Sequence, residues 1–186
     1  MHRSTGDLTE GLEHLLDSPG SEGVVEMIAA RPGEDQREQL STGKLDTEIG
    51  LVGDNWKARG SRHTEDGSAD QRAQLTLMNS RVVDLVAGAR DRWALAGDQL
   101  YVDFDLSKEN LPPGTRLQVG DAVIEVSDKP HTGCEKFASR FGAEALRFVN
   151  TGVGRGARFR GVNTFVVQSG EVSVGDSVLK LTEPDP

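Results

Sequence analysis

The sequence predicts a mainly β fold of the α+β class, with the strands closed or partly closed into a barrel and a few helices outside it. Many short apolar stretches are bounded by Gly, Pro and Asp, whereas only two or three stretches have the spacing of a helix. Strands and helices do not alternate regularly, which argues against a doubly wound sheet. Closing the sheet hides its edges, so a barrel is the expected form.

Short strands are expected along most of the chain after residue 22. The segment 99–107 is the clearest, because apolar side chains alternate there with a second set that contains Tyr101, Asp103 and Asp105. The tripeptide Val-Gly-Asp occurs three times, and we interpret each copy as a turn. The expected strands lie within 23–32, 36–45, 48–56, 73–78 and 99–107, two lie within 112–128, and three lie within 160–181.

The chain divides into three parts. Leucines recur at helical spacing near the start, and Ser4 with Asp7 is placed to cap that helix. We therefore assign residues 1–22 to an N-terminal helical extension, 23–182 to the barrel domain and 183–186 to a tail. The extension can dock on the barrel, mediate self-association or fray.

Two further helices are predicted. One has Met78, Val82 and Leu85 on a single face and Gly88 at its expected stop. The other covers residues 132–149, where Phe137, Phe141, Ala145 and Phe148 form an apolar face. The polar, glycine-bearing segment 57–73 is expected to be a long loop, and long ordered loops are often functional.

The composition narrows the possible partners and the location. The formal net charge is −9, which repels phosphate backbones and argues against nucleic-acid binding. No apolar run has the length of a membrane span or of a signal peptide. A single cysteine cannot form an internal disulfide, which suits a reducing compartment. We therefore expect a cytoplasmic protein that binds neither membranes nor nucleic acid.

The only cysteine lies in the stretch KPHTGCEKF, residues 129–137. Thr132 and Glu135 fit a capping box, which predicts Thr132 as the N-cap and Cys134 as the second helical residue. Free N–H groups and the helix dipole favour a thiolate at that position, and three neighbours add positive or hydrogen-bonding groups. Cys134 is thus a candidate nucleophile, sulfur carrier or soft-metal ligand, or otherwise a small buried hydrophobe. Those three neighbours are Lys129, His131 and Lys136.

Another stretch with possible chemistry is TGVGRGARFRG, residues 151–161. Arg155, Arg158 and Arg160 lie among glycines there, so guanidinium groups and backbone amides could hold a phosphate. The alternative is a solvated turn that leads into a strand. A structural zinc site is not supported, because His131 and Cys134 have no second pair of ligands at zinc spacing. No Ser-His-Asp pattern is present.

Two longer stretches resemble a known family. KPHTGCEKFASRFGAEALRFVN, followed by RGARFRGVNTFVVQSGEVSVGDSV, is similar to the MOSC domain, the C-terminal domain of molybdenum-cofactor sulfurases, in its small stand-alone bacterial type. The stretches ARP and GLVGDNW resemble the opening of that domain, so the resemblance extends over about Val24 to Leu181. Many bacterial members carry a His-Gly-Gly segment after the Gly-Asp turn, and this chain lacks it.

The resemblance implies a β-rich barrel and a site for the molybdenum cofactor, molybdopterin. It implies that Cys134 carries sulfur as a persulfide or ligates molybdenum, with His131 and Lys129 tuning it as catalytic neighbours. It also implies partners, which are a cysteine desulfurase, a molybdenum enzyme or an electron-donor protein. The residues that we expect to bind the pterin cofactor are Arg72, Thr132, Gly133, Lys136, Arg158 and Arg160.

Three functions follow from these features. The first is a molybdenum-cofactor-binding protein that carries or delivers sulfur through Cys134. The second is a molybdenum-dependent reductase of N-hydroxylated compounds in which Cys134 ligates the metal and a partner protein supplies electrons. The third is a binding module that has kept the fold without the chemistry. The chain has no room for a pyridoxal-phosphate desulfurase domain, so it would receive sulfur from another protein.

Overall fold

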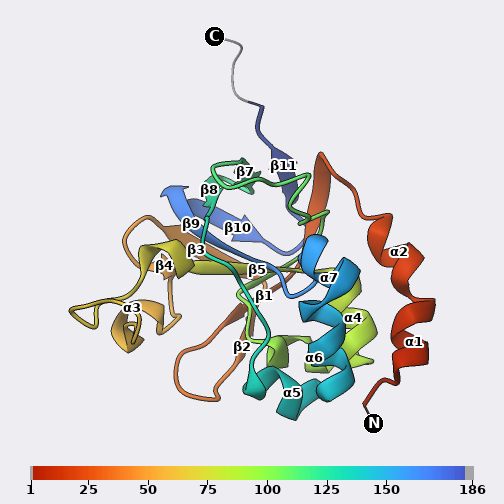
Figure 1. Ribbon diagram of the computed structural model, residues 1–186. Helices are drawn as coiled ribbons and strands as arrows, with labels where there is room; N and C mark the ends of the chain where they lie inside the picture. The colour runs from red at the N-terminus through yellow and green to blue at the C-terminus, as the bar shows by residue number, and fades with distance from the viewer. Residues whose placement is uncertain (1, 183–186) are drawn as a thin grey trace.

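The computed structural model describes residues 2–182 and contains a closed barrel of seven strands (Figure 1). Neighbouring strands pair in the ring order β1, β11, β7, β8, β9, β5, β6 and back to β1, and only β5 and β6 are parallel. The predicted β-barrel is therefore confirmed. The barrel strands are β1 (Glu22–Ala30), β5 (Leu75–Asn79), β6 (Leu100–Asp103), β7 (Arg116–Val119), β8 (Ala122–Val126), β9 (Val162–Gln168) and β11 (Ser177–Lys180).

Strands outside the ring extend the barrel at one side. β2 (Glu38–Leu40) pairs with the end of β1, and β10 (Gly170–Ser173), β3 (Thr42–Asp46) and β4 (Gly50–Leu51) form a separate three-stranded sheet. The three Val-Gly-Asp copies are turns, as predicted, because Gly53, Gly120 and Gly175 all have positive φ, at 90°, 55° and 96°.

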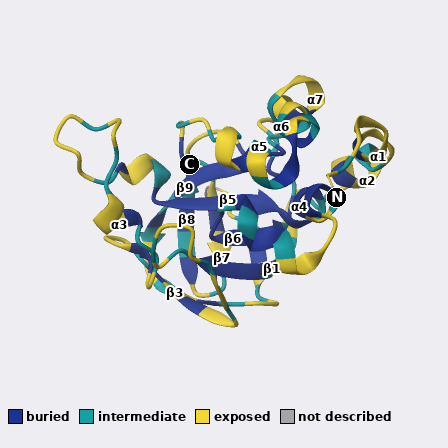
Figure 2. Cartoon of the chain, turned by 90° about the horizontal axis from the view of Figure 1, so that it is seen from below, coloured by how far each residue is buried: buried dark blue, intermediate teal, exposed yellow. Residues whose placement is uncertain are grey.

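The core has two layers, because the barrel is filled on its inside and covered by helices on part of its outside. Leu100, Val102 and Phe104 of the β6 segment point into the barrel. Tyr101 lies on the opposite face, as the alternation predicts, but helices cover that face and leave Tyr101 fully buried, with its hydroxyl donating to the carbonyl of Trp93. Figure 2 shows these buried strands within a shell of exposed loops and helix faces.

Five helical segments cover the barrel between β5 and β9 or connect its strands. The predicted helix near residue 80 is α4, and Gly88 ends it with a φ of 73°. The helix expected over 132–149 is broken in two, because Gly142 has a φ of 95° between the halves. The segments are α4 (Ser80–Ala87), η2 (Arg90–Ala96), α5 (Glu135–Phe141), α6 (Ala143–Asn150) and α7 (Gly152–Gly156).

The expected loop 57–73 contains more regular structure than predicted. It begins inside α3 (Trp56–Arg59) and ends with η1 (Gln71–Ala73), so only the segment between them is irregular. Asp70 caps η1 by accepting a hydrogen bond from the backbone N–H of Arg72. This cap brings Asp70 to the edge of the site described below.

The N-terminal segment packs on the helices outside the barrel. It forms α1 (Thr5–Glu10) and α2 (Leu12–Leu16), and Ser4 with Asp7 makes the predicted capping box. Leu8 and Leu15 are buried in the helical layer of the core. The predicted tail, 183–186, lies outside the described residues.

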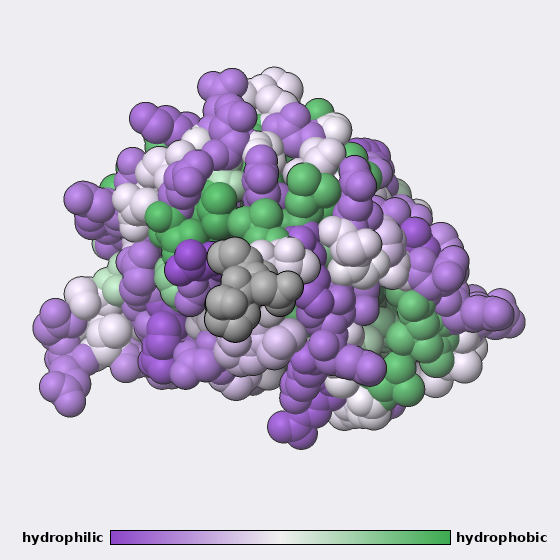
Figure 3. Space-filling model, turned by 90° about the horizontal axis from the view of Figure 1, so that it is seen from above, coloured by the Kyte–Doolittle hydropathy of each residue, from purple (hydrophilic) through white to green (hydrophobic). Residues whose placement is uncertain are grey.

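The surface is predominantly hydrophilic on the face shown in Figure 3, with apolar side chains gathered in a few places. Leu16 and Val153 are about half exposed and line a hollow between α2 and α7. Within residues 2–182, none of the helices has both the length and the apolar character that crossing a membrane requires.

Candidate functional site

Cys134 is the N-cap of α5, so the prediction that Thr132 caps this helix is wrong. The backbone stays extended until Cys134, whose carbonyl accepts hydrogen bonds from the N–H groups of Phe137 and Ala138 at 2.9 and 3.1 Å. The Cys134 side chain makes no capping hydrogen bond and is exposed as a free thiol. The alternative interpretation of a buried apolar cysteine is therefore also wrong.

The segment that leads to Cys134, residues 127–134, is an irregular stretch that side chains hold in place; we call it the cysteine loop. At its start, the buried Asn163 donates to the carbonyls of Lys129 and Pro130 at 3.2 and 3.1 Å. At its end, the Asn150 amide accepts from the N–H of Gly133 at 2.9 Å and donates to its carbonyl at 3.1 Å. These side-chain hydrogen bonds satisfy backbone groups that have no partner in a helix or sheet, because the segment is irregular.

A buried ion network fixes the middle of the cysteine loop. Asp98, which is fully buried, contacts Nε2 of His131 at 2.9 Å and Nη1 of Arg160 at 2.6 Å. Arg160 also donates to the carbonyl of Ala96 at 3.0 Å and lies over the ring of Phe137. The loop is thus tied to the chain segment just before β6 and to the start of β9.

The charges in this network decide the state of His131. Burial alone would raise the pKa of Asp98, but Arg160 and His131 outweigh it and lower the pKa to about 2. Burial and Arg160 lower the pKa of His131 below its ordinary value, against the opposing effect of Asp98. His131 is therefore neutral at pH 7, and it donates Nε2–H to the Asp98 carboxylate while Nδ1 keeps its lone pair.

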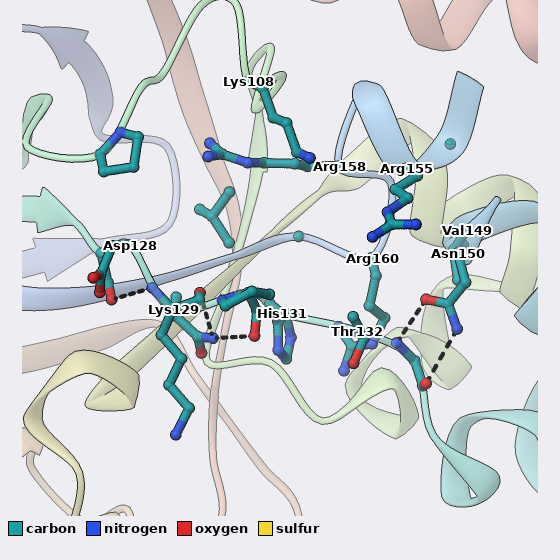
Figure 4. Close-up of a pocket in the computed structure, with 18 residues that line it drawn as sticks. Lys108, Asp128, Lys129, His131, Thr132, Val149, Asn150, Arg155, Arg158 and Arg160 are labelled. Carbon is teal, nitrogen blue, oxygen red and sulfur yellow. Dashed lines mark hydrogen bonds between the residues drawn. The ribbon is translucent and has the colours of Figure 1, made fainter. Parts of the chain in front are cut away.

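One face of the cysteine loop borders a cavity of about 640 Å³, shown in Figure 4. The loop forms one wall, and the opposite wall comes from Lys108 and from the segment that follows α6, with Arg155 and Arg158. Val149 and Val162 also line it, although both are almost fully buried. Gly133 lines this cavity, but Cys134 does not.

The other face of the cysteine loop lies towards the β1–β2 connection. Lys136, two residues after Cys134, pairs with Glu34 at 3.6 Å, and Arg140 at the other end of α5 pairs with Asp35 at 2.8 Å. Both carboxylates belong to the turn between β1 and β2. α5 therefore lies next to that turn, through Lys136 in its first half and Arg140 near its end.

Four arginines meet on this second face, and we call them the arginine cluster: Arg31, Arg37, Arg59 and Arg140. Arg31 donates to the carbonyl of Gly97 at 2.9 Å, and a Cβ at Gly97 would lie 3.8 Å from Nη2 of Arg37 and 4.0 Å from Nη1 of Arg140. Three guanidinium groups thus converge on a residue that has no side chain. Gly97 directly precedes Asp98, so the cluster adjoins the ion network.

The arginine cluster holds more positive than negative charge. Arg31 is paired in bidentate fashion with the buried Asp54, at 2.8 and 2.9 Å. Arg37 and Arg59 have no carboxylate partner within residues 2–182. Burial, together with repulsion from neighbouring arginines, lowers the pKa of both. A bound anion would relieve that repulsion.

The structure distributes the predicted site residues over both faces of the cysteine loop. Thr132, Gly133 and Arg158 line the cavity, whereas Cys134 does not line it and Lys136 pairs with Glu34 of the β1–β2 turn. Arg160 also lines the cavity, but its guanidinium is committed to Asp98 and Ala96.

Two further predicted residues are engaged with Asp70. The Lys129 ammonium lies 2.7 Å from its carboxylate, and Arg72 lies 3.3 Å from it. The hydrogen bond from Lys129 lowers the pKa of Asp70 to about 2. Lys129 and Arg72 thus brace the start of the cysteine loop and the β5 side of the site.

Several residues of the site were not predicted from the sequence. Asp98 and Asn150 hold the cysteine loop, Lys108 contributes to the cavity, and Arg37 and Arg59 belong to the arginine cluster. Asn150 ends the stretch KPHTGCEKFASRFGAEALRFVN and Arg31 lies in ARP, but neither stretch indicates a role for these two residues. Arg31 of ARP and Asp54 of GLVGDNW form an ion pair in the structure.

The family of the chain follows from a comparison of its sequence with family models. The model described as the MOSC domain matches residues 68–179, which is more than half of the chain. The chain belongs to the MOSC domain family. The matched segment includes the whole cysteine loop, and the resemblance inferred from the cysteine motif is confirmed. No curated protein sequence shows significant similarity to this MOSC protein.

Solved structures show the same fold. The YuaD protein from Bacillus subtilis matches with a TM-score of 0.64 and 16% identity, over 87% of this chain and 97% of that one. YiiM from Escherichia coli matches with a TM-score of 0.56 and 17% identity, over 89% and 72% of the two chains. YiiM from Geobacillus stearothermophilus matches with a TM-score of 0.52 and 13% identity, over 89% and 75%. At these identities the likeness concerns the fold.

Proposed function

We propose that this MOSC protein binds the molybdenum cofactor on the arginine-cluster face and that Cys134 is its reactive sulfur. One observation carries the proposal. An exposed free thiol lies at the start of α5, and ion pairs join α5 to the turn beside which Arg37 and Arg59 have no carboxylate partner among residues 2–182. A pterin cofactor would use both features, because its phosphate requires cations and its metal or sulfur requires a soft ligand such as a thiol.

The residues present fit such a group. Arg37 and Arg59 supply guanidinium donors, and the bare Gly97 leaves room between Arg37 and Arg140. Arg31 is held rigidly by Asp54, so the cluster is arranged before a ligand arrives. The cofactor, when bound, supplies a redox-active molybdenum centre; the chain supplies charge, shape and the thiol.

Cys134 can carry sulfur by thiol exchange. Its thiolate would attack the outer sulfur of a donor persulfide, the donor's thiolate would leave, and Cys134 would hold the sulfur as a persulfide. A second exchange would pass that sulfur atom to an acceptor and restore the thiolate. This route requires a donor such as a cysteine desulfurase and an acceptor such as a molybdenum enzyme.

The same exposed thiol also fits a metal ligand, as the reductase function requires. That function needs an electron-donor protein. The ion network serves either role in the same way, because it fixes the cysteine loop and keeps His131 neutral and oriented by Asp98. The two roles differ in what Cys134 holds, which is sulfur in the carrier and molybdenum in the reductase.

The test measures how much molybdenum, pterin and persulfide the protein contains after purification from a molybdenum-replete host. The wild type, Cys134→Ser and Cys134→Ala are compared. Molybdenum is measured by mass spectrometry, the pterin by fluorescence after oxidation, and a persulfide by intact mass. We expect pterin in the wild type. Loss of molybdenum with retained pterin in the variants assigns the ligand role, and a persulfide confined to the wild type assigns the carrier role.

The contrary result is equally specific. If wild-type protein takes up neither pterin nor sulfur when it is offered both, while Cys134 reacts with a thiol reagent no faster than a model peptide, the protein is a binding module without this chemistry. Circular dichroism and melting curves of the two variants show whether they are folded, so a loss cannot be mistaken for unfolding.

A further inference from the structure

The cavity on the opposite face of the cysteine loop has the features of a second ligand site. It has a volume of about 640 Å³, which is within the range of small-molecule pockets. It lies between the cysteine loop and the segment around α7, and Cys134 does not line it. This site goes beyond the proposed cofactor site, which lies on the other face.

The charge of the cavity selects an anion. Lys108, Arg155 and Arg158 line it, and within residues 2–182 none of the three forms an ion pair. In Figure 4 these three side chains come from the wall opposite the cysteine loop, and Asp128 lies apart from Arg155 at the far end. Among residues 2–182, Asp128 is the one acidic residue that lines this cavity, and its carboxylate lies 3.8 Å from the guanidinium of Arg72.

Arg158 is held in place for this role. Its backbone has a φ of 51°, a conformation that a residue with a side chain rarely adopts. Its Nη1 donates to the carbonyl of Leu111, which leaves further N–H groups of the guanidinium for a ligand. Burial lowers the pKa of Arg158, so the group bears a desolvation cost that an anion would offset.

The remaining lining determines the body of the ligand. Pro113 presents exposed apolar surface, Val149 and Val162 line the cavity but are only 2% and 3% exposed, and the amides of Asn150 and Asn163 already bind the cysteine loop. A small inorganic anion would leave the apolar surface uncovered. The lining therefore matches an organic molecule with one doubly charged group.

We propose that this cavity binds a small organic phosphate, with Lys108, Arg155 and Arg158 as its phosphate ligands. Three cations match a phosphate dianion better than a single carboxylate. The phosphate lies against the segment 152–158, and the organic body lies against Val149 and Val162. Residues 127–133 of the cysteine loop line the cavity and Cys134 does not, so the ligand contacts the loop without contacting the thiol.

The experiment titrates the unmodified chain, free of cofactor, with phenyl phosphate and with inorganic phosphate, and follows backbone amide signals by two-dimensional NMR. We expect signals of 127–133 and 152–158 to shift, and phenyl phosphate to bind more tightly than inorganic phosphate. Arg158→Gly should weaken phenyl phosphate by at least about tenfold, because a hydrogen bond from a charged group is lost. Glycine is chosen because the positive φ suits it, so the backbone is not strained further.

Two control variants separate the possible sites. Arg147→Gln changes an exposed arginine of α6 that does not line the cavity, and it should bind phenyl phosphate as the wild type does. Arg59→Gln should also leave this binding unchanged, whereas loss of binding in Arg59→Gln would move the phosphate to the arginine cluster and overturn the proposal. No shift of 152–158 in the wild type would overturn it as well.

The cofactor content of Arg158→Gly distinguishes this site from the cofactor site, since the pterin also carries a phosphate. Retained cofactor with lost phenyl phosphate binding supports two sites. Lost cofactor would show that the cavity is the cofactor site, and the second-site proposal would fail while cofactor binding itself would stand.

Discussion

The two faces of the cysteine loop differ in how their positive charge is arranged. On the arginine-cluster face, Arg31 and Arg140 are paired with carboxylates, and Arg37 and Arg59 add two further guanidinium groups. On the cavity face, the cations stand apart around a hollow with apolar walls. The first arrangement suits the proposed cofactor, which must also contact the Cys134 thiol. The second suits an organic phosphate that does not contact this thiol.

Both faces depend on the ion network of Asp98, His131 and Arg160, which fixes the cysteine loop. Removing Asp98 should therefore have the largest effect on stability. In Asp98→Ala, the buried Arg160 would lose its carboxylate and His131 its acceptor. We expect the free energy of unfolding to fall by roughly 3 to 5 kcal/mol, since an uncompensated buried charge remains. Urea denaturation of the wild type, Asp98→Ala and Asp98→Asn measures this.

Asp98→Asn keeps the shape of the side chain but not its charge. Its free energy of unfolding should therefore lie between those of the wild type and Asp98→Ala. Asp121→Ala changes an exposed aspartate of the β7–β8 turn and should cost little. If Asp98→Ala were as stable as Asp121→Ala, the two faces would not depend on a common support.

The second prediction concerns the pH dependence of stability, which arises from the charged groups that hold the cysteine loop. Asp70 and Asp98 have pKa values of about 2 in the folded chain, below those of the unfolded chain, so their contribution is full above pH 4 and is lost as the pH falls towards 2. For Asp70, the loss should be on the order of 2 kcal/mol. The lowered pKa of His131 has the same sign, because below about pH 6.5 the unfolded histidine gains a proton that the folded one does not.

The measurement is the free energy of unfolding from pH 7 to pH 2.5 for the wild type and for Lys129→Met. The variant removes the ammonium that lowers the pKa of Asp70, so its stability should decline less steeply below pH 4. Identical slopes would show that the Lys129–Asp70 pair does not hold the loop.

The third prediction separates the faces. Arg59→Gln removes a guanidinium of the arginine cluster, where we propose that the cofactor binds, and we expect the variant to retain about tenfold less cofactor, equivalent to roughly 1.4 kcal/mol. Arg62→Gln is the matched control, because Arg62 is an exposed arginine three residues further on. Pterin fluorescence per mole of protein is the readout, and equal content in the two variants would remove Arg59 from the site.

The smallest effect is expected at the end of the cysteine loop. Asn150→Ala removes both hydrogen bonds to Gly133, which should cost about 1 kcal/mol and loosen the loop locally. Hydrogen exchange should become faster at residues 132–135 and stay unchanged in the β7–β8 hairpin. Asn110→Ala, which alters an amide that binds Gly20 and Asp105, is the control and should not affect the loop.

Local patterns predicted much of the fold and part of the site. Strand alternation, the Val-Gly-Asp turns and the Gly88 stop are short-range features, and the structure contains all of them. The capping box at Thr132 was wrong because the tertiary bonds from Asn150 to Gly133 hold the backbone extended past Thr132. A pattern of four residues does not contain that information.

The supports of the site could not be predicted, because they are long-range. Asp98 lies 33 residues from His131 and 62 from Arg160. Arg31, Arg37 and Arg59 meet only because the β1–β2 turn and α3 return to the same place. The sequence therefore indicated Cys134 as a candidate but did not indicate Asp98 or the arginine cluster.

The most direct test of the two-face account is a crystal structure of the protein loaded with molybdenum cofactor, with the metal located by its anomalous scattering. We expect the molybdenum beside Sγ of Cys134 and the pterin phosphate against Arg37 and Arg59. Molybdenum or the pterin phosphate inside the cavity, against Lys108, Arg155 and Arg158, would contradict it.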